Sequence, residues 1–274
     1  MLGAPQDFNC GGGGDLVNSE ISLFKRALRE AQADPPWLKK GSGGGAGPKA
    51  KEQQRRWNPY SFEGGTSVVV RGDDFALVAS DTRMTNQIGY GVLTREADNT
   101  LQLSDKMLLA TAGFRGDILF LSRVLRHKLH KFKFDYRAEI DVDMCAQMIS
   151  RTHYYRRFFP ILTGTLLAGI DENGHGACYS FGPVGMIEKV DYGVSGDAQE
   201  PIEAFFDVQL ARKTLEGEGA EKAPPLTVER AKSLVRDAFR FAAERATGVG
   251  DSVQLLLCQA DKPIEKEVVP LRED

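Results

Sequence analysis

Histidines are the first candidates for acid–base or metal chemistry in this sequence, at His127, His130, His153 and His175. His127 and His130 fall on a lysine-rich helix face, which favours solvation over ligation. His153 has the chemistry for catalysis, but its place near the end of a predicted helix favours packing, and His175 falls in a predicted turn. No two histidines and a carboxylate share the spacing of a metal site, so we expect no metal and no other cofactor.

The cysteines are widely separated and form no CxxC pair, so the sequence predicts neither a zinc site nor a redox motif. They are Cys10, Cys145, Cys178 and Cys258. Unpaired thiols in a chain without a recognisable secretory signal fit a reducing compartment, and we expect the protein in the cytoplasm and nucleus. The turn at Gly113–Gly116 is not a phosphate loop, because no Lys-Ser/Thr follows it.

Composition limits the class of protein. The 274 residues are 42% hydrophobic and 27% charged, which is typical of one large globular domain with an extension, or of two small domains. No apolar run is long enough to cross a bilayer, and we expect no membrane association. Residues 1–56 carry a net charge of +3 and the remainder −6. An acidic body argues against nucleic acid as the main partner.

The first 56 residues differ in composition from the rest and predict an extension that is flexible, or is trimmed from the chain. Gly11–Gly14 and Gly41–Gly47 are low-complexity segments that bury little apolar surface. Asp15–Ala33 predicts a short helix that the following Pro-Pro pair would end. A loose basic patch favours a solvated tail over a nuclear-import signal; it comprises Lys49, Lys51, Arg55 and Arg56.

Residues 57–274 predict blocks of strands and helices in the order strands, two helices, strands, two helices, strands. The predicted strands are Thr66–Arg71, Phe75–Asp81, Met107–Ala112, Ile161–Ile170, Ala177–Phe181, Ser252–Gln259 and Ile264–Val269. The predicted helices begin at the capping residues Asp117, Asp141 and Thr227, and a further one covers Gln199–Lys213. Such blocks do not alternate as in a parallel βαβ fold. We therefore predict an α+β protein, a four-layer αββα sandwich of two largely antiparallel sheets.

Several motifs resemble the start of a proteasome beta subunit, namely Gly64–Thr66, Val78–Arg83 and Ala112–Asp117. Within that family, two further stretches are similar to the subunit at the sixth position of the eukaryotic beta ring. They are Tyr155–Pro160 and the segment comprising Ala168–Glu172 and Ala177–Gly185.

The resemblance covers about Trp57 to Asp274, whereas residues 1–50 match nothing that we can name. It implies the sandwich predicted above, here of the N-terminal nucleophile hydrolase type. It also implies assembly with other alpha and beta subunits into four stacked seven-membered rings, in which the beta rings enclose a proteolytic chamber. The process it implies is ATP- and ubiquitin-dependent protein degradation.

The same resemblance implies a test for catalysis. Active members attack the peptide carbonyl with an N-terminal threonine, which autocleavage of a Gly–Thr bond exposes. Gly65–Thr66 offers such a bond, so Thr66 is either a nucleophile or an ordinary threonine at a strand start. Aligned without a gap from Asp81, the family's orienting aspartate, the nucleophile position falls on Gly65. A shift of one residue turns a side chain to the opposite face of a sheet, so we expect the Thr66 hydroxyl to point away from the cleft.

The other positions implied by the family also depart from its pattern. The lysine position falls on Asn99, and no lysine occurs between Arg71 and Lys106. A unit charge at about 4 Å contributes on the order of 4 kcal/mol at an effective dielectric of about 20, roughly three decades in rate. Ser195 is a candidate for the serine that holds the amine. However, the downstream aspartate and serine positions fall on Ala246 and Val249.

Asp251 lies close to those positions in sequence, but Thr247–Asp251 resembles a tight loop of the inactive subunit. We therefore predict a non-catalytic structural beta subunit. The alternatives are an active threonine endopeptidase with Thr66 as nucleophile and a homo-oligomeric peptidase of the bacterial type. The missing lysine and the long extension both conflict with the bacterial type.

A subunit without chemistry would act through its surfaces. The run from Tyr154 to Phe159 combines aromatic and arginine side chains, which suit interface anchors. It comprises Tyr154, Tyr155, Arg156, Arg157, Phe158 and Phe159, and the alternative is a buried helix terminus. The acidic insert Glu216–Lys222 is either a contact or, preferably, a solvated loop.

Overall fold

The computed structural model describes residues 62–86, 91–211 and 225–271. All of them belong to the larger of the two units into which the chain divides, Trp57–Asp274. The predictions for the glycine-rich segments, the helix at residues 15–33, the basic patch and the insert Glu216–Lys222 lie outside the described residues.

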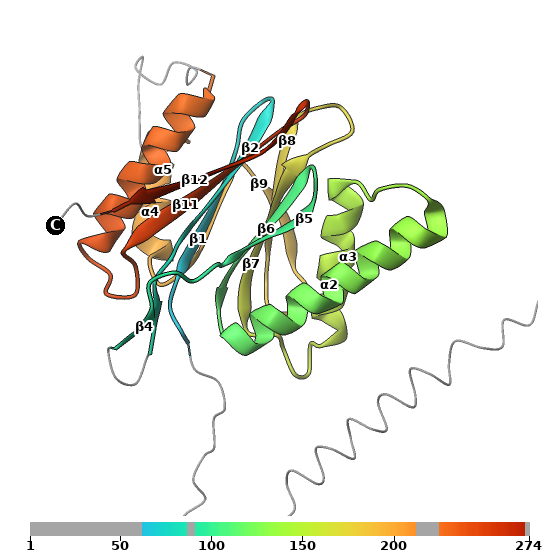
Figure 1. Ribbon diagram of the computed structural model, residues 1–274, viewed down its shortest axis with the longest axis horizontal. Coiled ribbons are helices and arrows are strands. Elements are labelled where there is room, and N and C mark those ends of the chain that lie inside the picture. The colour runs from blue at the N-terminus through green and yellow to red at the C-terminus, as the bar shows by residue number, and fades with distance from the viewer. Residues whose placement is uncertain (1–61, 87–90, 212–224, 272–274) are drawn as a thin grey trace, which may run out of the picture. The chain divides into compact units, whose positions relative to one another are not determined.

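Two five-stranded sheets form the centre of the molecule, and every strand pairing in them is antiparallel (Figure 1). The first sheet has the order β10 (Tyr192–Gly196), β1 (Thr66–Arg71), β2 (Phe75–Asp81), β11 (Ser252–Gln259) and β12 (Lys262–Pro270). The second has the order β5 (Thr100–Ser104), β6 (Met107–Gly113), β7 (Thr163–Ile170), β8 (Gly176–Phe181) and β9 (Ile187–Val190). A separate ribbon pairs β3 (Met84–Thr85) with β4 (Val92–Thr94).

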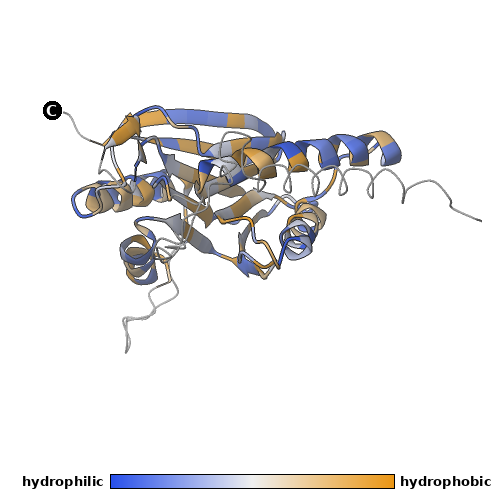
Figure 2. Ribbon diagram, turned by 90° about the horizontal axis from the view of Figure 1, so that it is seen from below, coloured by the Kyte–Doolittle hydropathy of each residue, from blue (hydrophilic) through white to orange (hydrophobic). Residues whose placement is uncertain are grey.

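Helices cover the outer face of each sheet, which gives four layers. The helices α4 (Gln199–Gln209) and α5 (Val228–Ala243) pack on the first sheet, and α2 (Arg115–Tyr136) and α3 (Val142–Tyr155) pack on the second. In Figure 2, α2 alternates between blue and orange along its length, as expected of a helix with one apolar side. This arrangement confirms the predicted αββα sandwich.

Three hydrophobic cores fill the spaces between the layers. Phe206 and Phe239 belong to the core between the first sheet and its helices, and Leu121 belongs to the one under α2 and α3. The core between the sheets includes Val69 and Leu166. Strand β1 contributes to two cores because alternate side chains of a strand point to opposite faces. This alternation fixes the direction of every side chain near the start of β1.

The sequence predicted the caps of two helices correctly and that of a third wrongly. The Asp141 carboxylate accepts a hydrogen bond from Asp143 N at 3.0 Å, and Thr227 caps α5 in the same manner. Asp117, predicted to cap α2, lies inside that helix, where its carboxylate accepts from Leu162 N at 2.8 Å. The strands β3, β4, β5, β9 and β10 were not predicted, because they are short and mostly half-exposed.

Candidate functional site

Two glycines bring the chain into β1. Gly64 and Gly65 have φ angles of 77° and 85°, a left-handed conformation that costs glycine little. A Cβ on Gly65 would lie 3.0 Å from Asn99 Nδ2 and 3.5 Å from Asp81 Oδ1. The fold therefore brings together Gly65, Asp81 and Asn99, which the sequence alignment had assigned to one site. Because the residue between Asp81 and Asn99 is Gly65, no side chain lies there.

Thr66 directs its side chain elsewhere. Its hydroxyl accepts a hydrogen bond from Ala198 N at 3.1 Å, at the start of α4. Val68 and Val70, on the same face of β1, belong to the core beneath α4 and α5. The Thr66 hydroxyl is thus buried on the helix side of the sheet, whereas the Cβ direction of Gly65 leads to Asn99.

The peptide bond between these two residues is hydrogen-bonded at both ends. Thr66 N donates to Asp81 Oδ1 at 2.8 Å, and Asp197 N donates to Gly65 O at 3.1 Å. Both groups of the bond that autocleavage would break therefore support the fold in its uncleaved form. Each such hydrogen bond contributes about 0.5–1.5 kcal/mol to stability, and the one to a carboxylate more.

Asp81 is a buried carboxylate without a lysine beside it. Burial raises the pKa of Asp81 well above its ordinary value, although backbone N–H groups of Thr66 and Gly250 partly oppose that rise. Its Oδ2 atom has no hydrogen-bond partner among the described residues. The Asn99 amide donates to the main-chain oxygen of Asp81, at 3.4 Å, and not to its carboxylate. The charge of Arg83 also lowers this pKa, but by less than burial raises it, so no cation among the described residues offsets the burial of Asp81.

Arg115 lies next to this site and was not predicted to take part in it. Its guanidinium donates to Asn99 Oδ1 at 3.3 Å and to Asp98 O at 2.8 Å. Its backbone N–H donates to Glu63 Oε2 at 2.9 Å. The sequence signal was the turn that precedes α2, but nothing in the sequence indicated that Arg115 would reach back to the loop before β5.

The distal positions supply little polar chemistry. Ser195 lies opposite Ser67 in the pairing of β1 with β10, and its Oγ would be 1.6 Å from a Cβ on Gly164. The Ser195 hydroxyl thus fills the space that this glycine leaves open on β7. Val249 is fully buried in the core under α4 and α5, and Ala246 packs against the same core.

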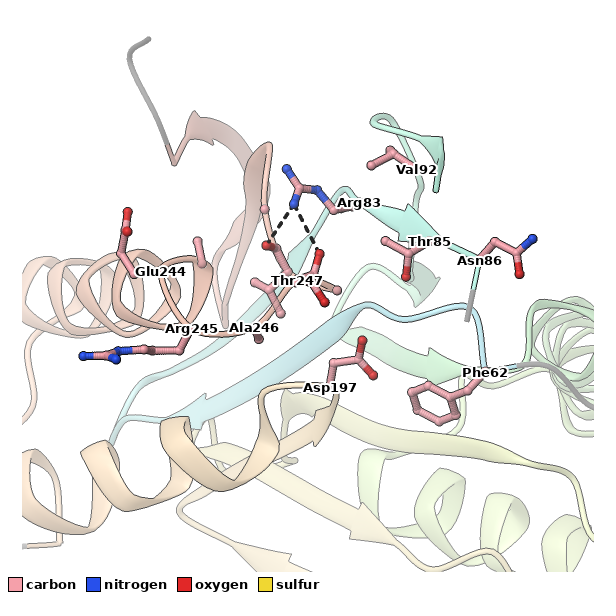
Figure 3. A pocket seen from close by; sticks show the side chains of 14 residues that line it. Phe62, Arg83, Thr85, Asn86, Val92, Asp197, Glu244, Arg245, Ala246 and Thr247 are labelled. Atoms are coloured by element: carbon pink, nitrogen blue, oxygen red, sulfur yellow. Dashed lines mark hydrogen bonds between the residues drawn. The ribbon is translucent and has the colours of Figure 1, made fainter. Parts of the chain in front are cut away.

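Asp251, the acid nearest to those positions in sequence, is engaged by arginines. Arg83 donates to its two carboxylate oxygens at 2.8 and 3.2 Å, and Arg95 donates at 2.9 Å. The hydrogen bond from Arg83 is the main cause that lowers the pKa of Asp251. Arg83 also donates to the carbonyls of Thr247 and Val249 at 3.3 and 3.4 Å, as Figure 3 shows. Asp251 therefore serves to hold its own loop.

A cleft of about 570 Å³ opens beside Gly64, lined by Phe62, Thr85, Asp197 and residues 243–250 among others. Figure 3 shows the Asp197 side chain between the start of α4 and the loop that follows α5. Its Oδ2 atom lies 3.3 Å from the place of a Cβ on Gly64, and burial raises the pKa of Asp197. Sequence reasoning missed Asp197; its only signal was its position two residues after Ser195.

The run from Tyr154 to Phe159 forms an exposed surface at the end of α3. We call the six residues from Tyr154 through Phe159 the aromatic patch. Its four aromatic side chains are between 56% and 85% exposed, so the alternative of a buried helix terminus does not describe this chain. Arg157 lies over the rings of Tyr154 and Phe158 at 4.7 and 4.3 Å, and Arg156 over that of Phe120 at 4.5 Å. Exposed cation–π contacts of this kind contribute about 0.5–1 kcal/mol each, so they favour the observed positions of the Tyr154 and Phe158 rings.

The histidines do not line the cleft, and they form no metal-binding cluster among the described residues. His153 is fully buried, has no hydrogen-bond partner for either ring nitrogen among the described residues, and stacks on Phe181. Burial lowers the pKa of His153, which keeps the ring neutral to lower pH. The described part of the chain contains no group of three His, Cys, Asp or Glu residues arranged for a metal ion. None of its helices is both long and apolar enough to span a membrane.

The four-layer sandwich, with a buried aspartate that accepts a hydrogen bond from the first residue of a central strand, defines the class of N-terminal nucleophile hydrolase folds. Residues 61–258 match the family model described as "Proteasome subunit". The chain therefore belongs to the proteasome subunit family.

Its relatives are beta subunits. "Proteasome subunit beta type-1" of Caenorhabditis elegans is 46% identical over 258 residues, covering 94% of this chain and 95% of that protein. The protein of the same name in Danio rerio is 37% identical over 221 residues, 81% of this chain and 91% of that protein. "Probable proteasome subunit beta type-6" of Schizosaccharomyces pombe is 34% identical over 226 residues, 81% of this chain and 99% of that protein.

The match to the C. elegans protein also changes one expectation about the extension. Because residues 57–274 number 218, a match of 258 residues includes at least 40 of the first 56. Most of the extension, for which the sequence alone offered no resemblance, therefore has a counterpart in another beta subunit.

Proposed function

We propose that this chain is a non-catalytic structural beta subunit of the proteasome core particle, at the sixth position of the beta ring. In this role it forms part of the wall of the proteolytic chamber, in contact with other alpha and beta subunits in stacked seven-membered rings. The particle that it helps to build degrades proteins in the ATP- and ubiquitin-dependent pathway, in the cytoplasm and nucleus.

The direction of the Thr66 hydroxyl carries this proposal. It is bound to Ala198 N beneath α4, and the place beside Asp81 and Asn99 belongs to Gly65, which has no side chain. A threonine nucleophile needs its hydroxyl, a proton acceptor and a nearby cation at one place. Here the hydroxyl and the buried aspartate face different spaces, and an amide stands where the family has its lysine.

Two observations support the structural role and the ring position. The aromatic patch exposes four rings and Arg157, with Arg156 half-buried beside them, and these residue types anchor protein–protein interfaces. The stretches Tyr155–Pro160 and Ala177–Gly185 resemble the sixth beta-ring subunit. Both segments lie at or next to the exposed end of α3.

The test is the state of the Gly65–Thr66 bond in purified core particles. We expect the intact mass of this subunit to show a chain that begins upstream of Gly65, and an epoxyketone-type inhibitor to leave Thr66 unlabelled. The catalytic subunits of the same particle provide the positive control, since they must be labelled. A mature chain that begins at Thr66 and is captured by the inhibitor would replace this proposal with the alternative, an active threonine endopeptidase.

A further inference from the structure

Phe62, Glu63, Gly64 and Gly65 form a short segment, here called the strap, that enters the cleft ahead of β1. We infer that Glu63 latches the strap into the cleft, so that the chain itself fills the space in which an extended peptide would otherwise pair with β3. This inference rests on the proposed function, since a chain cleaved before Thr66 would have no strap.

The first anchor is between main-chain atoms. Glu63 O accepts a hydrogen bond from Thr85 N at 2.9 Å. Thr85 belongs to β3, the two-residue strand that pairs with β4 and borders the cleft. An incoming extended peptide would need such a backbone N–H, because strand addition depends on main-chain hydrogen bonds. The strap already occupies this donor.

The second anchor is between the Glu63 side chain and α2. Its Oε2 atom accepts from Arg115 N at 2.9 Å, at the first residue of the helix. The N-cap residue, Phe114, provides no side-chain cap, so a helix N–H group that lacks a partner within α2 is satisfied from outside the helix. A carboxylate at this position is also favoured by the helix dipole. Glu63 thus links the strap to α2 across 52 positions of sequence.

The third anchor is steric. Phe62 lines the cleft of about 570 Å³ and also a second cleft, of about 450 Å³, between the sheets. Its ring lies 3.5 Å from the place of a Cβ on Gly113. A Cβ on Gly64 would be 2.7 Å from Thr85 Oγ1, so the strap backbone lies close against β3. The strap therefore contacts both walls of the space it enters.

These contacts make Glu63 a positioning residue with two separable effects. Loss of its carboxylate removes the cap on Arg115 directly. It releases Thr85 N only if the strap itself leaves the cleft, because Thr85 bonds to the main chain of Glu63 and not to its side chain. Amide hydrogen exchange at Thr85 therefore distinguishes a latch from a simple helix cap.

The experiment compares amide exchange at Thr85 and Arg115 in assembled core particles containing wild type, Glu63→Ala, Glu63→Gln or Glu96→Ala. We expect about tenfold faster exchange at both amides in Glu63→Ala, the effect of losing one or two hydrogen bonds on a local opening equilibrium. Glu63→Gln keeps an acceptor of the same length and should stay close to wild type at Thr85. Glu96 is an exposed carboxylate outside the strap, and its replacement should change neither amide.

The outcomes separate this inference from the proposed function. If Glu63→Ala accelerates exchange at Arg115 but leaves Thr85 protected, Glu63 is only a cap and the latch is wrong. If Glu63→Ala does not assemble, Glu63→Gln and Phe62→Ala take its place. The latch is supported if the Thr85 amide stays protected from exchange in Glu63→Gln and loses protection in Phe62→Ala. Equal protection of Thr85 in both variants overturns the inference. A wild-type chain that begins at Thr66 would instead overturn the proposed function.

Discussion

The cleft at the start of β1 and the aromatic patch at the end of α3 hold their distinctive side chains in opposite ways. At the start of β1, Asp81 and Thr66 are fully buried. Thr66 N donates a hydrogen bond to the Asp81 carboxylate, and the Thr66 hydroxyl accepts one from Ala198 N at the start of α4. In the patch, Phe158 and its aromatic neighbours are exposed, and Arg157 lies over the rings of Phe158 and Tyr154. The residues at the start of β1 are thus covered by the chain's own fold, whereas the patch leaves its apolar area in water.

The difference indicates where each region obtains its stability. A buried polar group must find its partners inside the fold, because leaving it unsatisfied costs about 1–3 kcal/mol. An exposed ring contributes the free energy of burial only when another surface covers it, and that contribution is roughly 25 cal/mol per Å² of apolar area. Changes in the cleft should therefore alter folding, and changes in the patch should alter assembly.

The largest effect is expected from truncating the aromatic patch. Phe158→Ala together with Phe159→Ala should weaken incorporation into the core particle by about 2–4 kcal/mol, roughly 30- to 1000-fold in affinity. The unassembled chain should keep its stability to within about 0.5 kcal/mol, because neither ring is buried in it. Quantitative mass spectrometry of assembled particles, beside chemical unfolding of the free chain, measures both.

The matched control for that experiment is Phe134→Ala. Phe134 and Phe158 are equally exposed, at 85%, but Phe134 lies near the end of α2 and outside the patch. Incorporation of the control should exceed that of the double variant. Equal losses would mean that the patch has no special part in assembly.

The next effect concerns the glycine that enters β1. Gly65→Ala should lower the free energy of unfolding by about 1–3 kcal/mol, since a Cβ is strained at a φ of 85° and meets Asn99 Nδ2 at 3.0 Å. Gly91→Ala is the control, because apart from the adjoining residues no described atom lies within 4 Å of its added Cβ, and its φ lies outside the left-handed range. Comparable losses from both substitutions in denaturant titrations would contradict the strain.

Much of the fold around these two regions could be predicted from the sequence, and the predictions that failed did so for identifiable physical reasons. The bounds of β1 and β2 follow from continuous apolar runs, and burial on both faces explains those runs. The cap of α2 was assigned wrongly because Glu63, which performs it, is far away in sequence. Asp197 was missed for the same reason: its approach to Gly64 depends on the pairing of β1 with β10, and no local pattern encodes that pairing.

A smaller effect should appear in the pH dependence of stability. The raised pKa of Asp81 means that the folded chain binds this proton more tightly than the unfolded chain, whose carboxyl titrates near about 3.9. From there up to the raised folded pKa, the free energy of unfolding should fall as pH rises, by at most about 1.4 kcal/mol per pH unit. Asp81→Asn keeps an oxygen for Thr66 N and removes this fall.

Between about pH 4 and about pH 8, the free energy of unfolding of Asp81→Asn should therefore rise relative to that of the wild type as pH rises. Asp105→Asn, which changes an exposed carboxylate in the turn between β5 and β6, supplies the comparison. Parallel curves for Asp81→Asn and wild type would mean that Asp81 keeps an ordinary pKa in the folded chain. That result would mean that the backbone N–H groups and the charge of Arg83 together offset the burial of this carboxyl.

The smallest effect should come from the arginine that fixes the patch. Arg157 lies between the rings of Tyr154 and Phe158, at 4.7 and 4.3 Å, and exposed contacts of this kind contribute about 0.5–1 kcal/mol. Arg157→Ala should therefore weaken incorporation only about two- to fivefold, by letting the rings move before they dock. Arg151→Ala, which changes an exposed arginine within α3 that lies over no ring of the described residues, should leave incorporation unchanged. A loss as large as that of the double phenylalanine variant would mean that Arg157 itself pairs with an acidic group on the partner, and that the patch binds by charge more than by its rings.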